Sequence, residues 1–202
     1  MSILSKITAK PWLQDQGVMD EYGPWDLPPA KLALGWLIAA LTVMFCLFGL
    51  AYGIRMDTGD WRPLNEPGVL WLNTVVLVMC SLAFQAARSA ARKEQAAQLL
   101  LALGLGGVLT IGFLLGQWFA WGELDKAGYY LTSNPANAFF YLLTALHGIH
   151  LIGGLLVWTR ATFRVMRGTD IADVRLSVEL CSTYWHFLLL IWLAIFALLL
   201  AT

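Results

Sequence analysis

Five long apolar runs constrain the fold of this 202-residue chain more than any other feature. They cover residues 32–54, 69–87, 98–121, 138–159 and 178–201. A helix rises about 1.5 Å per residue, so roughly 20 residues cross the hydrocarbon core of a bilayer, and each run is about that long. Charged side chains are missing from the middle of every run, where each would cost roughly 2.5–3.5 kcal/mol. The sequence therefore predicts an all-α membrane protein, a bundle of five transmembrane helices.

The composition supports the same class. Hydrophobic residues make up 59% of the chain and charged residues only 13%, whereas about 25% of the residues in a soluble domain are charged. The formal net charge is zero, so we expect no nucleic-acid partner.

Two regions and one orientation are predicted. Residues 1–30 are polar and interrupted by prolines, so we expect a cytoplasmic arm ahead of a membrane domain that covers residues 31–202. We also expect the first spanning helix to direct the chain to the membrane. Ten of the 13 lysines and arginines lie in the N-terminal segment up to Lys31 and in the second and fourth loops. The positive-inside rule then places the N-terminus in the cytoplasm and the C-terminus outside.

All three histidines lie within the last two apolar runs. His147 and His150 share one helix face, and His186 lies in the next run. Imidazole is a common metal or haem ligand. A metal site needs three or four ligands, however, and no Asp, Glu or Cys completes such a set. The alternative is that the imidazoles hydrogen-bond between helices and fix their register.

Other polar residues indicate structural contacts. Glu179 begins the last run near the cytoplasmic boundary, where we expect an ion pair with Arg160. Asn73 is expected to bridge helices. A proton relay would require carboxylates at membrane depth, and the apolar runs contain none there.

Three stretches of the sequence resemble subunit III of the haem–copper respiratory oxidases (the cytochrome c oxidase subunit III family). The first is Pro-Leu-Asn at 63–65 followed by Leu-Asn-Thr at 72–74. The second, at 143–150, is similar to the family's Thr-Gly-x-His-Gly-x-His helix. The third combines Glu179 with Tyr-Trp-His-Phe at 184–187 and Trp192. The three stretches occur in the family's order, on the second, fourth and fifth spans.

The resemblance implies a short, five-helix bacterial form in the inner membrane. Such a protein is a non-catalytic partner of subunit I, which holds the haems and copper, reduces dioxygen and pumps protons. The resemblance further implies that this chain binds no redox centre, contacts other oxidase subunits and phospholipids, and supports assembly, lipid retention and sustained proton uptake. The residues that it marks as signature or interhelical packing residues are Asn73, His147, His150, Glu179, Trp185 and His186. Arg164 matches a basic position that contacts a lipid phosphate in relatives, and Arg160 is a second candidate.

The sequence also departs from the family pattern. Leu41 and Leu189 stand where relatives usually have carboxylates, and the family's Gln-x-x-Glu-Tyr ending of the third span becomes Gln-Trp-Phe-Ala-Trp at 117–121. Any function of those carboxylates is therefore not expected of this chain.

Several functional readings remain open. The leading one is an accessory subunit of a proton-translocating terminal oxidase whose electron donor is cytochrome c or quinol. A second is a subunit-III-like protein associated with nitric oxide reductase. A third, from another class, is a free-standing membrane enzyme with a histidine metal site.

Overall fold

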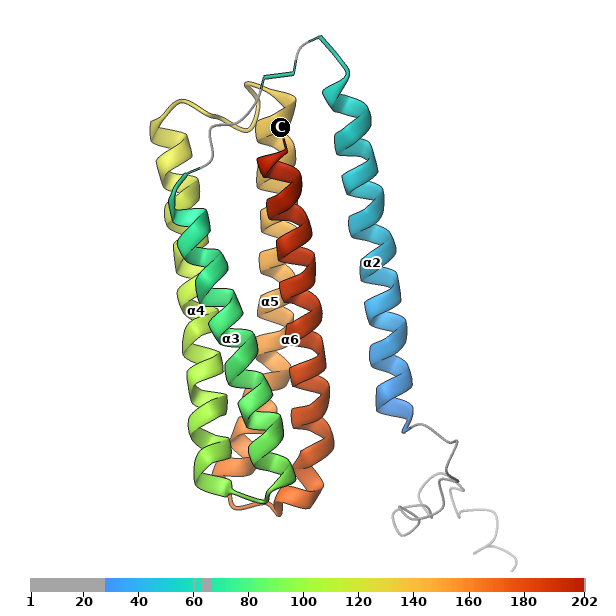
Figure 1. Cartoon of the computed structure of the whole chain (residues 1–202), viewed down its shortest axis with the longest axis vertical. Coiled ribbons are helices and arrows are strands. Elements are labelled where there is room, and N and C mark those ends of the chain that lie inside the picture. The colour runs from blue at the N-terminus through green and yellow to red at the C-terminus, as the bar shows by residue number, and fades with distance from the viewer. Residues whose placement is uncertain (1–27, 60, 63–66, 202) are drawn as a thin grey trace, which may run out of the picture. The chain divides into compact units, whose positions relative to one another are not determined.

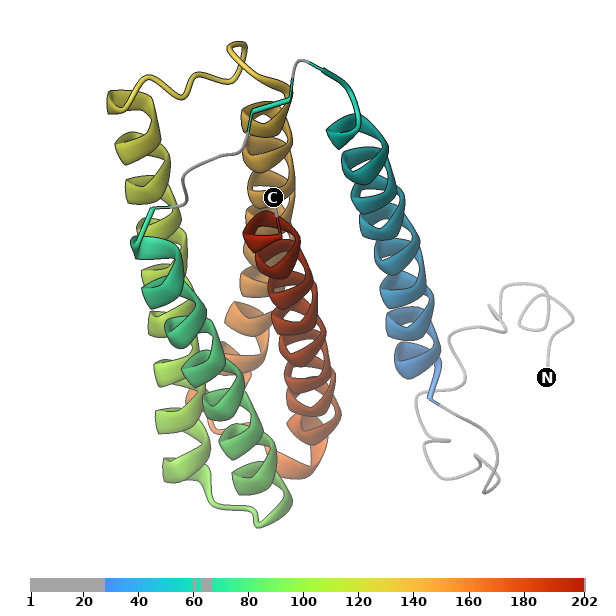
Figure 2. The ribbon, with the colours of Figure 1, turned by 45° about the horizontal axis from the view of Figure 1, so that its top comes forward.

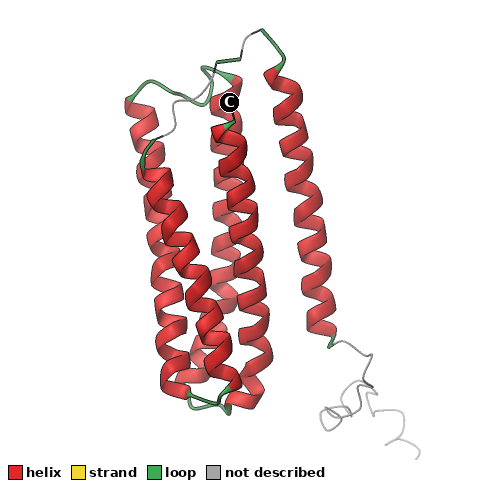
Figure 3. Cartoon of the chain, in the orientation of Figure 1, coloured by secondary structure: helices red, strands yellow, loops and turns green. Residues whose placement is uncertain are grey.

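The structure, a computed structural model, describes residues 28–59, 61–62 and 67–201. Helices form nearly all of this part of the chain, and it contains no strand (Figure 3). The five helices are α2 (Pro29–Met56), α3 (Val69–Arg92), α4 (Ala96–Lys126), α5 (Pro135–Met166) and α6 (Ile171–Leu200). Each is long and apolar enough to cross a bilayer, which confirms the predicted fold class. Residues 1–27 and the Pro-Leu-Asn motif at 63–65 lie outside the described residues.

The chain divides into two compact units, residues 1–36 and 37–202. The described residues of the first unit, 28–36, contain the first turns of α2. In the second unit, α3 packs against α4 and α6, and α5 packs against the same two helices. The four helices therefore form a closed ring of antiparallel neighbours, which Figures 1 and 2 show from two directions.

Within the second unit, α2 meets α5 through aromatic side chains. The rings of Phe45 and His150 lie edge to face with centroids 5.8 Å apart, and those of Tyr52 and Phe139 are 5.4 Å apart. Tyr52 also packs on Trp61, in the loop that follows α2. Edge-to-face pairs of this kind are favourable because the positive ring edge meets the negative ring face.

The helix ends carry recognisable capping residues. The Asn134 side chain accepts a hydrogen bond from the backbone N–H of Ala136 and so caps α5, with Pro135 at its first position. The same side chain donates to the carbonyl of Arg62 at 2.5 Å, which ties the α2–α3 loop to the start of α5. At its other end, α5 ends at Met166, and Gly168 two residues later has a φ of 76°, which is readily available only to glycine.

Several glycines lie at close helix contacts, among them Gly116 and Gly154. A Cβ at Gly116 would fall 2.0 Å from Oδ1 of Asn73, and one at Gly154 would meet the Trp185 and Tyr184 rings at 3.0 Å. Small residues allow helix backbones to approach closely in membranes. At Gly49, Gly53, Gly112 and Gly153, by contrast, a Cβ would meet no described heavy atom within 4 Å.

Candidate functional site: signature side chains inside the helix ring

His147 lies at the centre of the ring of four helices and is fully buried. Its imidazole packs against Phe113 of α4, with centroids 5.7 Å apart, and against Trp192 of α6 at 5.4 Å. Neither ring nitrogen has a hydrogen-bond partner among the described residues. The position of this ring is therefore set by aromatic packing, and the predicted hydrogen bond between helices is not made here.

Trp192 and Trp185 are the largest buried side chains of α6, and each is anchored by its indole nitrogen. Trp192 donates a hydrogen bond to the hydroxyl of Thr74 on α3 at 2.9 Å. Trp185 donates to the hydroxyl of Thr110 on α4 at 3.0 Å and stacks on Phe84 with centroids 4.2 Å apart. Because a buried indole N–H needs an acceptor, these bonds fix the position of α6 against both α3 and α4.

His186 faces α3, away from the other two histidines. Its Nε2 donates to the amide oxygen of Gln85 at 3.2 Å, because a carbonyl oxygen only accepts. Its Nδ1 then accepts a hydrogen bond from the hydroxyl of Ser81. This imidazole bridges α3 and α6, which is the kind of contact that the sequence suggested for the histidines.

His150 lies one turn beyond His147 and is half-buried. The Nδ1 of His150 donates to the carbonyl of Leu146 in the same helix at 2.6 Å. The backbone carbonyl of His150 accepts a hydrogen bond from the hydroxyl of Tyr184 on α6 at 3.2 Å. The three imidazoles are therefore held by different groups. Among the described residues, no group of three or more His, Cys, Asp and Glu is arranged to bind a metal ion.

Glu179 forms ion pairs with two arginines of α3. Its Oε1 accepts from Arg88 and lies 3.5 Å from Nη2 of Arg92. The sequence suggested Arg160 of α5 as the partner, whereas the structure supplies arginines from the opposite neighbour of α6. A signal for them was present: Arg88 and Arg92 lie four residues apart, on one helix face, at the same end of the helices as Glu179.

Asn73 is buried and its side chain lies close to Gly116 of α4, but its Nδ2 has no hydrogen-bond partner among the described residues. Gln117, which follows Gly116 in α4, is also buried, and its amide atoms have no partner among the described residues. Of the positions that depart from the family pattern, Leu41 is buried. Trp121, at the end of the departing 117–121 stretch, donates to the hydroxyl of Thr144 at 3.1 Å and so joins α4 to α5.

The two candidate lipid-binding arginines lie near the end of α5. Arg160 is exposed and Arg164 is half-buried. Contact with a lipid phosphate stays a prediction for both.

Thr110 and Phe113 are central contacts that the sequence analysis missed. Thr110 accepts from Trp185, contacts the Cys80 sulfur at 3.1 Å and donates to the carbonyl of Gly106 at 2.8 Å. A lone hydroxyl in the middle of an apolar run was the available signal. Phe113 offered none, because one phenylalanine in an apolar helix is indistinguishable from the lipid-facing ones.

Comparison with known proteins places the chain in a family. The sequence model for "Cytochrome c oxidase subunit III" matches residues 42–201. Cytochrome c oxidase subunit 3 of Synechocystis sp. is 28% identical over 168 residues, which cover 81% of this chain and 71% of that protein. The probable cytochrome c oxidase subunit 3 of Nocardia farcinica is 29% identical over 168 residues, 80% of this chain and 82% of the relative. The resemblance seen in the motifs is thereby confirmed: the chain is a multi-pass membrane protein that belongs to the cytochrome c oxidase subunit III family.

Proposed function

We propose that this chain is a non-catalytic accessory subunit of a bacterial haem–copper terminal oxidase. In this role it packs against subunit I, which carries the haems and copper, and supports the assembly, lipid retention and sustained proton uptake of that oxygen-reducing, proton-pumping subunit. The observation that carries the proposal is the match of residues 42–201 to the subunit III family.

The way in which the signature side chains are used supports a structural role. Trp185 binds a hydroxyl on α4, His186 binds two side chains on α3, and Glu179 pairs with two arginines on α3. These residues hold the helices of one chain together, and their partners lie on two different helices rather than at one common point. We propose that they fix the shape of the surface that the chain presents to subunit I.

The proposed orientation in the inner membrane places the α3–α4 and α5–α6 connections on the cytoplasmic side. Those connections meet at one end of the four helices (Figure 1). They bring together most of the arginines of the membrane domain, and basic residues accumulate on the cytoplasmic side of membrane proteins.

Lipid retention is proposed at this same end. Arg164 and Arg160 lie one turn apart on the last turns of α5. A guanidinium at the membrane boundary meets a lipid phosphate through two parallel hydrogen bonds and through charge attraction. We propose a phosphate headgroup as the ligand of these two arginines.

Affinity purification of the chain from native membranes tests the proposal. We expect it to bring down a haem-containing partner that consumes oxygen with cytochrome c or quinol. Membranes that lack the chain should contain oxidase whose activity declines faster during repeated turnover. A haem partner that reduces nitric oxide instead would assign the chain to that enzyme, and recovery of the chain without any haem protein would contradict the proposal.

A further inference from the structure

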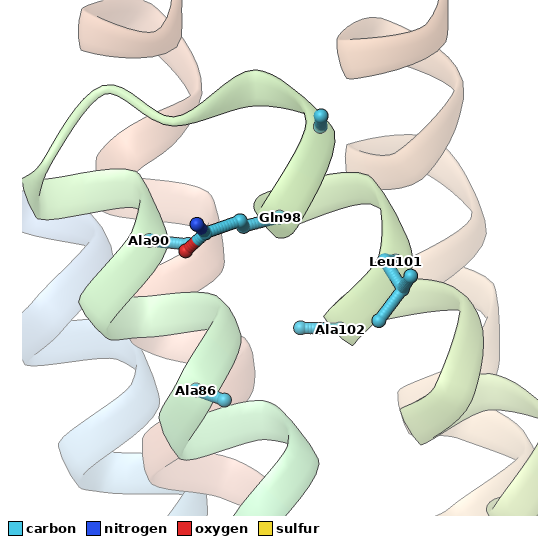
Figure 4. Close-up of a pocket in the computed structure, with 6 residues that line it drawn as sticks. Ala86, Ala90, Gln98, Leu101 and Ala102 are labelled. Atoms are coloured by element: carbon cyan, nitrogen blue, oxygen red, sulfur yellow. The ribbon is translucent and has the colours of Figure 1, made fainter.

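A hollow of aromatic side chains lies at the end of α4 that leads into the loop to α5. It is lined by Trp118, Trp121, Gly122, Asp125, Leu131 and Tyr141. Three aromatic rings and one carboxylate therefore surround the same space, at the end of α5 opposite to Arg160 and Arg164. A second hollow, between α3 and α4 near their connection (Figure 4), is lined mainly by alanines and has no charged side chain.

Two of the three rings are held in place by hydrogen bonds. The indole of Trp121 donates to the Thr144 hydroxyl at 3.1 Å, and the Tyr141 hydroxyl donates to the carbonyl of Tyr129 at 3.2 Å. Trp121 and Tyr141 lie with centroids 6.1 Å apart and planes inclined by 59°, and Trp118 lies 6.3 Å from Trp121. A ligand that enters this hollow therefore meets two aromatic walls whose positions are already fixed, which reduces the side-chain entropy lost on binding.

The electrostatics of the hollow favour a cation. The faces of indole and phenol rings carry partial negative charge. The exposed carboxylate of Asp125 adds a full negative charge, and the negative end of the α4 helix dipole lies at the same end of the helix. Lys126 follows Asp125 directly but is not among the lining residues, because successive side chains on a helix point about 100° apart.

The surface next to the hollow can bind the apolar part of such a ligand. A stripe of exposed apolar side chains on α4 runs from Trp118, which is 70% exposed, toward the middle of the helix through Leu115, Ile111 and Val108. These residues are spaced three or four apart and so share one face. In a membrane-spanning helix such a face contacts hydrocarbon chains, so a molecule with an ammonium group above and acyl chains below fits the whole surface.

We infer that this hollow binds the ammonium headgroup of a zwitterionic phospholipid. The primary ammonium of phosphatidylethanolamine or the quaternary ammonium of phosphatidylcholine lies over the rings of Trp118, Trp121 and Tyr141 and next to the Asp125 carboxylate. The acyl chains lie along the exposed stripe of α4. The ligand chemistry differs from that proposed for Arg160 and Arg164, which recognise the phosphate.

Native mass spectrometry of the full chain tests this site. The protein is reconstituted into nanodiscs that contain phosphatidylglycerol mixed with either phosphatidylethanolamine or phosphatidylcholine, and the lipids retained after release into detergent are identified. We expect retention of an ammonium lipid over phosphatidylglycerol, and a reduction of about five- to tenfold in Asp125→Asn and in Trp118→Ala. The matched controls are Asp57→Asn, an exposed carboxylate beyond α2, and Trp71→Ala, an exposed tryptophan of α3.

The two lipid arms separate the sources of the ammonium group. Preference for phosphatidylethanolamine shows that hydrogen bonds from a primary amine dominate, and preference for phosphatidylcholine shows that ring contacts dominate. Equal retention of phosphatidylglycerol, or loss in the control variants to the same extent, overturns the inference. It is also overturned if Asp125→Asn leaves lipid retention unchanged but weakens binding of a partner subunit, because the cation would then be a lysine or arginine of that partner. Lipid retention is read on the chain itself, so its outcome is independent of whether a haem subunit copurifies.

Discussion

The indole nitrogen of Trp185 and the hydroxyl of Thr110 lie 3.0 Å apart, and the hydrogen bond between them joins α6 to α4 through the middle of the helix ring. The same hydroxyl lies 3.1 Å from the sulfur of Cys80 on α3. Three helices therefore meet at one small polar group in an otherwise apolar layer.

Replacing Thr110 by valine is expected to lower the free energy of unfolding by about 1–2 kcal/mol, since the buried indole N–H loses its acceptor while the volume is nearly unchanged. Thermal unfolding in detergent measures this effect. Thr159→Val is the matched control, because the exposed Thr159 hydroxyl bonds only to the carbonyl of Leu155 in its own helix. Equal stability of the two variants would contradict the role of Thr110.

Replacing Gly107 by alanine is expected to destabilise the contact between α4 and α5. A Cβ at this position would fall 2.2 Å from the Trp158 ring, whose nitrogen is held by the carbonyl of Leu103 at 3.0 Å. Overpacking of this kind typically costs about 1–3 kcal/mol. Gly104→Ala on the same helix meets no described atom within 4 Å, so it should be neutral or slightly stabilising in the same unfolding experiment.

The ion pairs of Glu179 are expected to contribute modestly and in a salt-dependent way. The Arg88 and Glu179 side chains are 27% and 24% exposed, so water and salt screen part of their attraction. A double-mutant cycle with Glu179→Gln and Arg88→Gln should give a coupling of about 1 kcal/mol at low salt, and less at high salt. Arg167→Gln, in the exposed α5–α6 connection, should show no coupling to Glu179. A coupling near zero at low salt would show that the pair does not hold α3 to α6.

Substitution of His147 or His186 by alanine is expected to loosen the complex with its haem partner without altering the haem spectrum. His147→Ala leaves a cavity between Phe113 and Trp192, while His186→Ala removes a bridge from α6 to Ser81 and Gln85 on α3. The measurements are the yield of copurified haem protein and its absorbance spectrum. A changed spectrum at normal assembly would instead place these imidazoles near the haems.

Loss of Arg164 is expected to release a bound anionic lipid. The half-buried guanidinium at the end of α5 is the proposed phosphate contact, so native mass spectrometry of Arg164→Ala should show fewer retained phosphatidylglycerol molecules. Arg167→Ala, an exposed arginine three residues further on, is the control. Unchanged lipid retention in Arg164→Ala would remove this residue from the proposed site.

The fold class could be predicted from the sequence because the bilayer imposes a simple rule. Uncharged runs of about 20 residues must form helices in hydrocarbon, and five such runs become five helices. The helices are longer than the apolar runs: α5 continues to Met166 and α6 begins at Ile171. Backbone hydrogen bonding continues past the hydrocarbon boundary, where arginine and aspartate side chains reach water, so hydropathy alone does not mark where a helix ends.

The partners of the candidate site residues were harder to predict. The choice between Arg160 and Arg88 for Glu179 depends on which helices are neighbours on each side of α6, and apolar runs do not encode that order. The environment of His147 likewise depends on Phe113, which no sequence pattern distinguishes. The motifs nevertheless identified the family. A motif is recognised from its residue types and their spacing, without knowledge of which side chains pack together.

The central claim is that this chain acts only through a catalytic partner. Its most direct test is oxygen consumption and bound haem, iron, copper and zinc, measured on the chain expressed alone and on the same chain copurified from native membranes. The account predicts that oxygen consumption and haem absorbance belong to the copurified complex and that the isolated chain has neither. Oxygen reduction by the isolated chain, or a stoichiometric metal ion lost in His147→Ala or His186→Ala, would contradict it.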